Sequence, residues 1–259
     1  MWGGGEVLGH IDGQLGVVTL ARPGKHNAMT RSMWAALPVV LHRVASCSGV
    51  EAVVIRGADN SFSAGADLSE VLAATASEDE ATEFCTGVVS ALLAVARCPL
   101  PTIAALQGVA AGGGAEIALA ADLRIAEHGA TLQLPLARLG VVPDGFTLQR
   151  LISLAGPSAA RLLLFAGRAM EAEHCLRIGL MDEVVPHGSL DDAVRSLARA
   201  FAAGSPYALQ RTKQLLLATE AQAGLSDLVT EMAQSFVHGD VAANASRFLH
   251  RKRDPAASP

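Results

Sequence analysis

Short apolar runs alternate with helical patterns through most of the chain, and this alternation limits the fold more than any other feature. Strand-like runs, each short and flanked by Gly, Pro or Asp, occupy 15–23, 52–57, 101–108, 121–127 and 182–186. Helical patterns lie between them, at 30–46 with Thr30 as a predicted N-cap and at 78–97 with acids in the first turn. Strands that alternate with helices predict an α/β domain with a mostly parallel sheet.

The strand signals stop near residue 188, and the remaining segments read as helices. We therefore predict a core over residues 1–188 and a helical C-terminal region over residues 189–259. At 259 residues and 51% hydrophobic content, the chain is long enough for this arrangement.

Charge and composition exclude several classes of function. The net charge is −5 and aromatic residues make up only 4%, so neither a basic surface nor a stacking platform for nucleic acid is expected. The four cysteines are widely spaced and suggest packing residues rather than a metal site. Residues 98–115 carry no charge, but two prolines, a glutamine and several glycines predict a buried strand, a turn and a helix start rather than a membrane span. The N-terminus lacks the pattern of a secretory signal, so we expect a cytoplasmic protein.

Two glycine-containing turns follow apolar runs, at 61–68 (SFSAGADL) and 107–116 (QGVAAGGGAE). Neither has the lysine of a phosphate loop or the spacing of a dinucleotide-binding fingerprint. Glycine between a strand and a helix lets backbone N–H groups approach a ligand, and two such turns that converge would form an oxyanion hole. The glycines alone leave the alternative of two tight turns that serve packing.

Together with RPGKHNAM near the start and RFLHRKRDP near the end, these turns closely resemble the enoyl-CoA hydratase/isomerase (crotonase) superfamily, over about residues 5–254. The resemblance implies a ββα-spiral core and a helical C-terminal region that forms homotrimers or dimers of trimers. It implies an acyl-CoA thioester as substrate, with no separate cofactor, metal, nucleic acid or membrane partner. It also implies that the N–H groups of Ala66 and Gly113 bind the thioester oxygen, on which the negative charge of an enolate develops.

The same resemblance implies which residues contact coenzyme A. Basic groups near the two ends of the chain would approach its phosphates, although an ordinary solvated charged tail is the alternative for the C-terminal ones. The predicted CoA contacts are Arg22, Lys25, Ala64, Ala66, Asp67, Leu68, Gly112 and Lys252.

Two carboxylates are the candidate catalytic groups. Glu116 matches the first glutamate of the family hydratases. Leu136 stands where the second is expected, and leucine cannot transfer a proton. Asp144 is the candidate replacement, because dienoyl-CoA isomerases carry an aspartate before a similar TLQRL; the alternative is an N-cap for the helix that follows. Leu136 and Phe146 would line an apolar acyl pocket and raise the pKa of a nearby carboxyl group.

The sequence therefore predicts an acyl-CoA-binding enzyme that works through an enolate, with hydration of an enoyl-CoA as the expected reaction. Isomerisation of an enoyl- or dienoyl-CoA by Glu116 and Asp144 is the mechanistic alternative, because Leu136 removes the usual second acid. An alternative of another class is a non-catalytic acyl-CoA-binding protein that kept the oxyanion turns.

Overall fold

A computed structural model describes residues 2–4 and 6–220. Its large sheet has the strand order β1-β2-β3-β4-β5-β7-β10, antiparallel from β1 to β3 and parallel from β3 onward. The five predicted strands are all present in the parallel part. The strands are β1 (Trp2–Gly4), β2 (Val7–Asp12), β3 (Leu15–Leu20), β4 (Ala52–Gly57), β5 (Thr102–Leu106), β7 (Leu123–Glu127) and β10 (Glu183–Val185).

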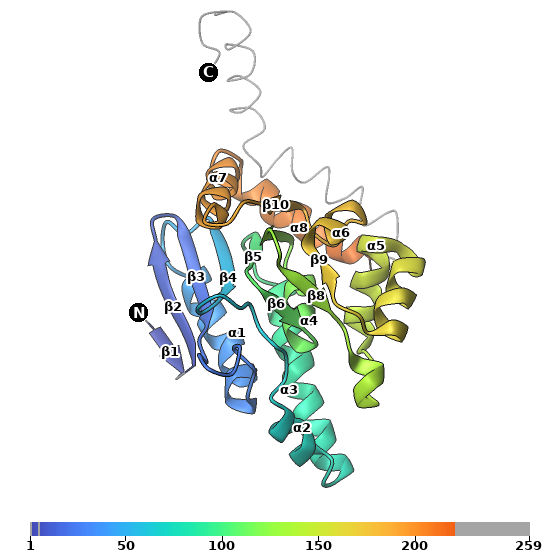
Figure 1. The fold of residues 1–259 in the computed structure, drawn as a ribbon. Helices are drawn as coiled ribbons and strands as arrows, with labels where there is room; N and C mark the ends of the chain where they lie inside the picture. The colour runs from blue at the N-terminus through green and yellow to red at the C-terminus, as the bar shows by residue number, and fades with distance from the viewer. Residues whose placement is uncertain (1, 5, 221–259) are drawn as a thin grey trace, which may run out of the picture.

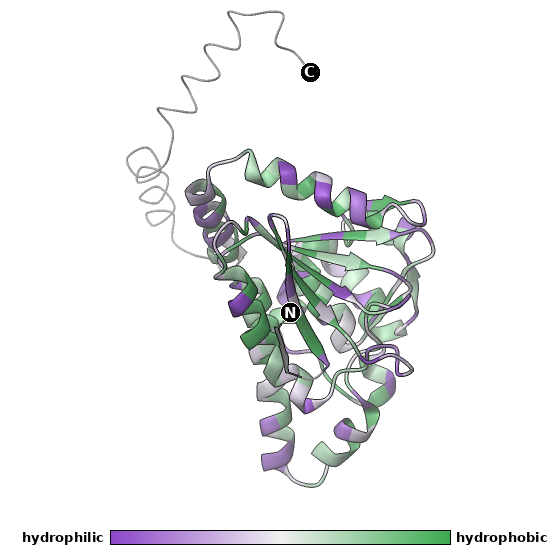
Figure 2. Ribbon diagram, turned by 90° about the vertical axis from the view of Figure 1, so that its left-hand side faces the viewer, coloured by the Kyte–Doolittle hydropathy of each residue, from purple (hydrophilic) through white to green (hydrophobic). Residues whose placement is uncertain are grey.

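Helices cover both faces of the large sheet (Figure 1). Successive side chains of a strand point to opposite faces, so Val53 and Ile55 of β4 join one core while Ala52 and Val54 join another. The first core is completed by α1 (Arg31–Ala45), α3 (Glu78–Ala96) and α4 (Gly113–Ala120), and the second by α7 (Leu190–Ala202). This double coverage explains why the central strands are predominantly hydrophobic along their length (Figure 2).

A second, smaller sheet has the order β6-β8-β9 and was not predicted from the sequence. It consists of β6 (Val109–Ala111), β8 (Thr131–Gln133) and β9 (Met170–Glu171). Because β6 is inserted between β5 and α4, the segment 98–115 forms two strands before its helix rather than one. This short strand delivers the chain directly to the start of α4.

The remaining helices and their ends follow the local sequence signals. Thr30 caps α1 as predicted, with its Oγ1 accepting from the N–H of Met33 at 3.3 Å. One long helix, α5 (Gly145–Ala166), is kinked at Gly156, whose φ is 76°. The others are α2 (Leu68–Ala74), the 3-10 helix η1 (Leu136–Leu139), α6 (Ala172–Arg177) and α8 (Pro206–Glu220).

The predicted change of character near residue 188 agrees with the structure as far as it is described. Only helices, α7 and α8, follow β10 up to residue 220. The third predicted C-terminal helix lies outside the described residues, so the boundary at 188 and the trimerisation role of 189–259 stay predictions. Within residues 2–4 and 6–220, no helix is long and apolar enough to span a membrane.

Candidate active site

The first glycine-containing turn, residues 61–68, is held between two neighbouring backbone segments. On one side, Met29 pairs with Ala66 in an isolated parallel bridge. On the other side, Ser63 pairs in the same way with Ala110 of β6. The backbone at Ala66 is therefore fixed by contacts with segments far away in the sequence, although it belongs to no regular strand.

The second turn leads from β6 into α4 and lies directly against the first. Gly112 adopts a φ of 49°, a conformation that favours glycine, and Gly113 begins α4. A Cβ added to Gly65 would lie 2.5 Å from the Ala111 oxygen and 2.9 Å from the Gly113 nitrogen. A Cβ added to Gly113 would lie 3.5 Å from the Ala66 nitrogen. Glycine is required here because the two backbones touch.

The contact places two backbone donors side by side without protein acceptors. Within the described part of the chain, the N–H groups of Ala66 and Gly113 have no hydrogen-bond acceptor, whereas their neighbour Gly112 donates to the Gln133 oxygen at 2.9 Å. The convergence of the two turns is the arrangement expected from the sequence. Neither donor is used by a protein acceptor in this part of the chain, and their role as an oxyanion hole stays a prediction.

Asn27 holds the backbone next to the first turn through hydrogen bonds of its side chain. This role was not predicted from the sequence. Asn27 has a buried side chain and a φ of 55°, and its Oδ1 accepts from the N–H of Arg22 at 3.0 Å. Its Nδ2 donates to three backbone oxygens, those of Ala58, Ser61 and Phe62. An asparagine directly before the apolar start of a helix pattern was the available signal, since asparagine tolerates the left-handed conformation better than most residues.

Ser63 also connects two backbone segments through its side chain. Its hydroxyl is buried within the first turn, donates to the Asn27 backbone oxygen at 2.8 Å and accepts from the Gly65 N–H at 3.2 Å. The hydroxyl is therefore occupied by the backbone of the turn. Its place is structural rather than that of a nucleophile.

Glu116 lies one helical turn after Gly113, on a helix whose described side chains are all buried. Its carboxyl group is 8% exposed and has no hydrogen-bond partner among the described residues. Burial, and secondarily the negative charge of Asp144, raise the pKa of Glu116 to about 7. A carboxyl group with a pKa near neutrality can both donate and accept a proton.

Asp144 is the N-cap of α5, and it uses one oxygen for that purpose. Its Oδ1 accepts from the N–H groups of Phe146 at 2.9 Å and Thr147 at 3.0 Å. Its Oδ2 has no hydrogen-bond partner among residues 2–4 and 6–220. The charge of Asp144 acts on Glu116, so the fold brings the two predicted acids together. The cap role is thus present, and the second oxygen stays available for chemistry.

The two residues predicted to line an acyl pocket pack on the main core. Leu136 begins η1 and is buried at 8% exposure, and Phe146 is partly buried against the same core. Burial raises the pKa of Glu116, and the predicted contribution of Leu136 and Phe146 to a carboxyl pKa stays a prediction. Whether an acyl chain contacts either residue stays a prediction.

Arg22, a predicted CoA contact, is engaged by acidic side chains. Its Nη1 lies 2.5 Å from Asp67 Oδ2 and its Nε lies 3.4 Å from Glu6 Oε1. Asp67 in turn caps α2 and accepts from Ser69, and the hydrogen bonds from Ser69 and Arg22 hold the pKa of this carboxyl well below its usual range. The pair ties the loop after β3 to the turn that carries Ala66.

The other predicted CoA contacts lie at or near the surface of the same region. Lys25, Ala64 and Leu68 are exposed, and Gly112 is half-buried beside Gly113. Lys252 lies outside the described residues. The positions are compatible with a ligand that approaches the two turns from solvent, and the contacts themselves stay predictions.

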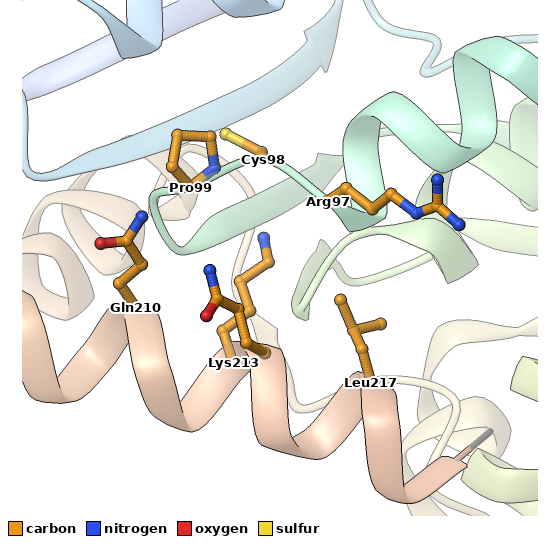
Figure 3. A pocket seen from close by; sticks show the side chains of 7 residues that line it. Arg97, Cys98, Pro99, Gln210, Lys213 and Leu217 are labelled. Carbon is orange, nitrogen blue, oxygen red and sulfur yellow. The ribbon is translucent and has the colours of Figure 1, made fainter. Parts of the chain in front are cut away.

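A cavity elsewhere in the molecule does not belong to this site. It has a volume of about 190 Å³ and lies between α8 and the loop at 97–99, where Lys213 points toward Pro99 (Figure 3). The Lys213 ammonium is already bound to the Leu100 oxygen and to Asp122 Oδ2. Within the described residues, no cluster of His, Cys, Asp or Glu side chains could hold a metal ion.

Comparisons with known proteins show what the whole chain is similar to. The family described as Enoyl-CoA hydratase/isomerase matches residues 10–253. Probable enoyl-CoA hydratase EchA17 of Mycobacterium tuberculosis is 36% identical over 220 residues, covering 85% of this chain and 80% of that protein. Carnitinyl-CoA dehydratase of Salmonella enteritidis is 34% identical over 210 residues, 79% of each chain. The structure of an enoyl-CoA hydratase/isomerase family protein from Hyphomonas neptunium superposes with a TM-score of 0.89 at 30% identity, covering 95% of both chains.

Proposed function

Since the chain belongs to the enoyl-CoA hydratase/isomerase family, we propose that it hydrates an enoyl-CoA through an enolate held by the N–H groups of Ala66 and Gly113. This proposal rests on the burial, the pKa and the position of Glu116. Its carboxyl group is buried, has a pKa of about 7, and lies one helical turn from a backbone N–H without a protein acceptor.

Hydration needs one proton acceptor and one proton donor, and the two acids can fill these roles. Water must lose a proton as its oxygen attacks Cβ, and Cα must gain one as the enolate collapses. We propose that Oδ2 of Asp144, which makes no hydrogen bond among the described residues, accepts the proton of the water, and that protonated Glu116 delivers one to Cα. Meanwhile the two N–H donors stabilise the charge on the thioester oxygen, which is larger in the enolate than in the ground state.

Isomerisation of an enoyl- or dienoyl-CoA is a second candidate, favoured by a specific observation. Leu136 is buried in the core, and the resemblance to the family implies that it stands where hydratases have their second acid. Moving a double bond needs no water, only a base that removes a proton at one carbon and an acid that returns one at another. Glu116 and Asp144 could exchange these roles, because the charge of one acts on the other.

One assay separates the two reactions. The protein is incubated with crotonyl-CoA, a 3-enoyl-CoA and a 3,5-dienoyl-CoA in deuterated buffer, and absorbance and deuterium uptake at Cα are followed. Loss of the crotonyl-CoA absorbance with formation of the 3-hydroxy product supports hydration. Conversion of the 3-enoyl or dienoyl substrate without hydration supports isomerisation. Tight binding with no exchange at Cα would overturn both in favour of a binding protein, and the Glu116→Gln variant controls for uncatalysed exchange.

We also propose that the CoA thioester is the substrate and that no further cofactor takes part. The proposed assembly is a homotrimer or a dimer of trimers, and the proposed compartment is the cytoplasm. Analytical ultracentrifugation of the full chain tests the assembly, and a monomer at micromolar concentration would contradict it.

A further inference from the structure

Trp34, on the first turns of α1, touches one of the two oxyanion-turn donors directly. A Cβ added to Gly113 would lie 2.7 Å from Cζ2 and 2.9 Å from Cη2 of the Trp34 ring. The indole is 2% exposed and belongs to the main core. The outer edge of its six-membered ring therefore rests against the backbone of Gly113.

The same helix is tied at its start to the other donor. Immediately before α1, the Met29 N–H donates to the Gly65 oxygen at 2.7 Å, and the Met29 oxygen accepts from the Asp67 N–H at 2.9 Å. These bonds enclose Ala66 on the neighbouring segment. The Trp34 N–H then donates to the Thr30 oxygen at 2.9 Å, within the first turn. A rigid helical turn thus connects the backbone that holds Ala66 with the ring that contacts Gly113.

We propose that Trp34 is a positioning residue that sets the separation between the N–H groups of Ala66 and Gly113. The inference rests on the proposed function, in which both donors bind one thioester oxygen. Donors of this kind act only when they lie within a few tenths of an ångström of the ideal distance from the developing charge. A displacement of about 1 Å lowers a rate by roughly 10²-fold.

The indole nitrogen of Trp34 indicates that the size of the ring matters for the contact with Gly113. Its buried Nε1 has no hydrogen-bond partner among the described residues. A buried donor without an acceptor destabilises the fold, and phenylalanine would avoid this. Phenylalanine is also shorter, so it would withdraw the edge formed by Cζ2 and Cη2 from Gly113. Stability therefore favours phenylalanine at this position, whereas the contact with Gly113 requires the larger indole ring.

The primary test compares Trp34→Phe with Leu41→Ala, a matched change at another buried side chain of α1. We measure kcat, KM, the urea midpoint, and the infrared C=O stretch of bound butyryl-CoA labelled with 13C at the thioester carbonyl. For Trp34→Phe we expect kcat to fall roughly 10- to 100-fold with KM within about threefold, and the C=O stretch to move toward that of free butyryl-CoA. Leu41→Ala should lower the urea midpoint and leave the stretch unchanged.

A compensating pair tests the contact itself. Gly113→Ala adds a methyl group that clashes with the Trp34 ring but meets the Ala66 nitrogen only at 3.5 Å, an ordinary contact. Trp34→Leu makes room for that methyl group. We expect the double variant to be at least about fivefold more active than Gly113→Ala alone, a non-additivity typical of residues in contact.

A failure of the proposed function and a failure of the proposed role of Trp34 give different results. A wild-type C=O stretch equal to that of free butyryl-CoA would overturn the oxyanion hole and with it the proposed function. A shifted wild-type stretch that Trp34→Phe leaves unchanged, together with an unchanged kcat, would overturn the role of Trp34 alone. A double variant no more active than Gly113→Ala would overturn the contact as its basis.

Discussion

Replacing Glu116 by glutamine should stabilise the protein at high pH and remove its activity. The pKa of Glu116 is about 7, against a reference value of 4.5. Since one pKa unit corresponds to 1.36 kcal/mol, ionising this carboxyl costs about 3 kcal/mol more in the folded protein than in the unfolded chain. The side chain is 8% exposed, so solvent screening reduces this figure little. Glutamine has nearly the same shape and never ionises.

The sign and the pH window follow from the direction of that pKa change. A raised pKa favours the protonated folded state, so the stabilisation is complete below pH 4.5 and is lost as the pH rises through about 7. Relative to Glu116→Gln, the wild type should therefore lose about 2.5 kcal/mol of unfolding free energy between about pH 5 and about pH 8. The other titrating groups are shared by the two proteins and cancel in the difference, except Asp144, whose charge interacts with that of Glu116.

Urea unfolding followed by circular dichroism, at equal protein concentrations across this pH range, measures the effect. The difference in unfolding free energy should grow steadily in favour of Glu116→Gln as the pH rises. A difference that stays constant within about 0.5 kcal/mol would refute the reasoning, because it would mean that folding does not raise the pKa of this carboxyl. The acid–base role of Glu116 would then lose its physical support.

Three further substitutions test the site. Asp144→Asn keeps an N-cap residue but removes the proposed base and a charge that raises the pKa of Glu116, so kcat should fall and the basic limb of the pH–kcat profile, which follows the loss of the Glu116 proton, should move to lower pH. Asn27→Ala leaves three buried backbone oxygens without their donor and should lower the urea unfolding free energy by about 2–3 kcal/mol. Leu136→Glu places an acid where hydratases have one, so crotonyl-CoA hydration should rise while the melting temperature falls because a carboxyl group replaces a core leucine.

The sequence predicted those strands whose apolar pattern is long enough to read. The runs that became β3, β4, β5 and β7 are largely buried on both faces, and such strands appear as continuous hydrophobic stretches. The strands of the second sheet span only two or three residues and were missed, whereas β10, also three residues long, was predicted. Strands this short carry no periodicity and are fixed by their neighbours.

The site was predictable to the extent that its chemistry is local. The two turns and the two possible roles of Asp144 are visible in the sequence. The structure shows the N-cap role through Oδ1, and the catalytic role stays a proposal. The Arg22–Asp67 ion pair was not predictable, because its partners are far apart in the chain. The role of Asn27 depends on a left-handed backbone conformation that composition does not reveal.

The isolated bridges that join Met29 to Ala66 and Ser63 to Ala110 have a consequence for the order of folding. The backbone donors lie in loops whose conformation is imposed by three segments that meet only after long stretches of chain have been closed. Contacts between distant segments form late, because their loop entropy must be overcome first. The pairing of β3 with β4 and of β4 with β5 closes loops of similar length, so the donor-bearing segments should dock together with the large sheet, and binding competence should appear only when that sheet has formed.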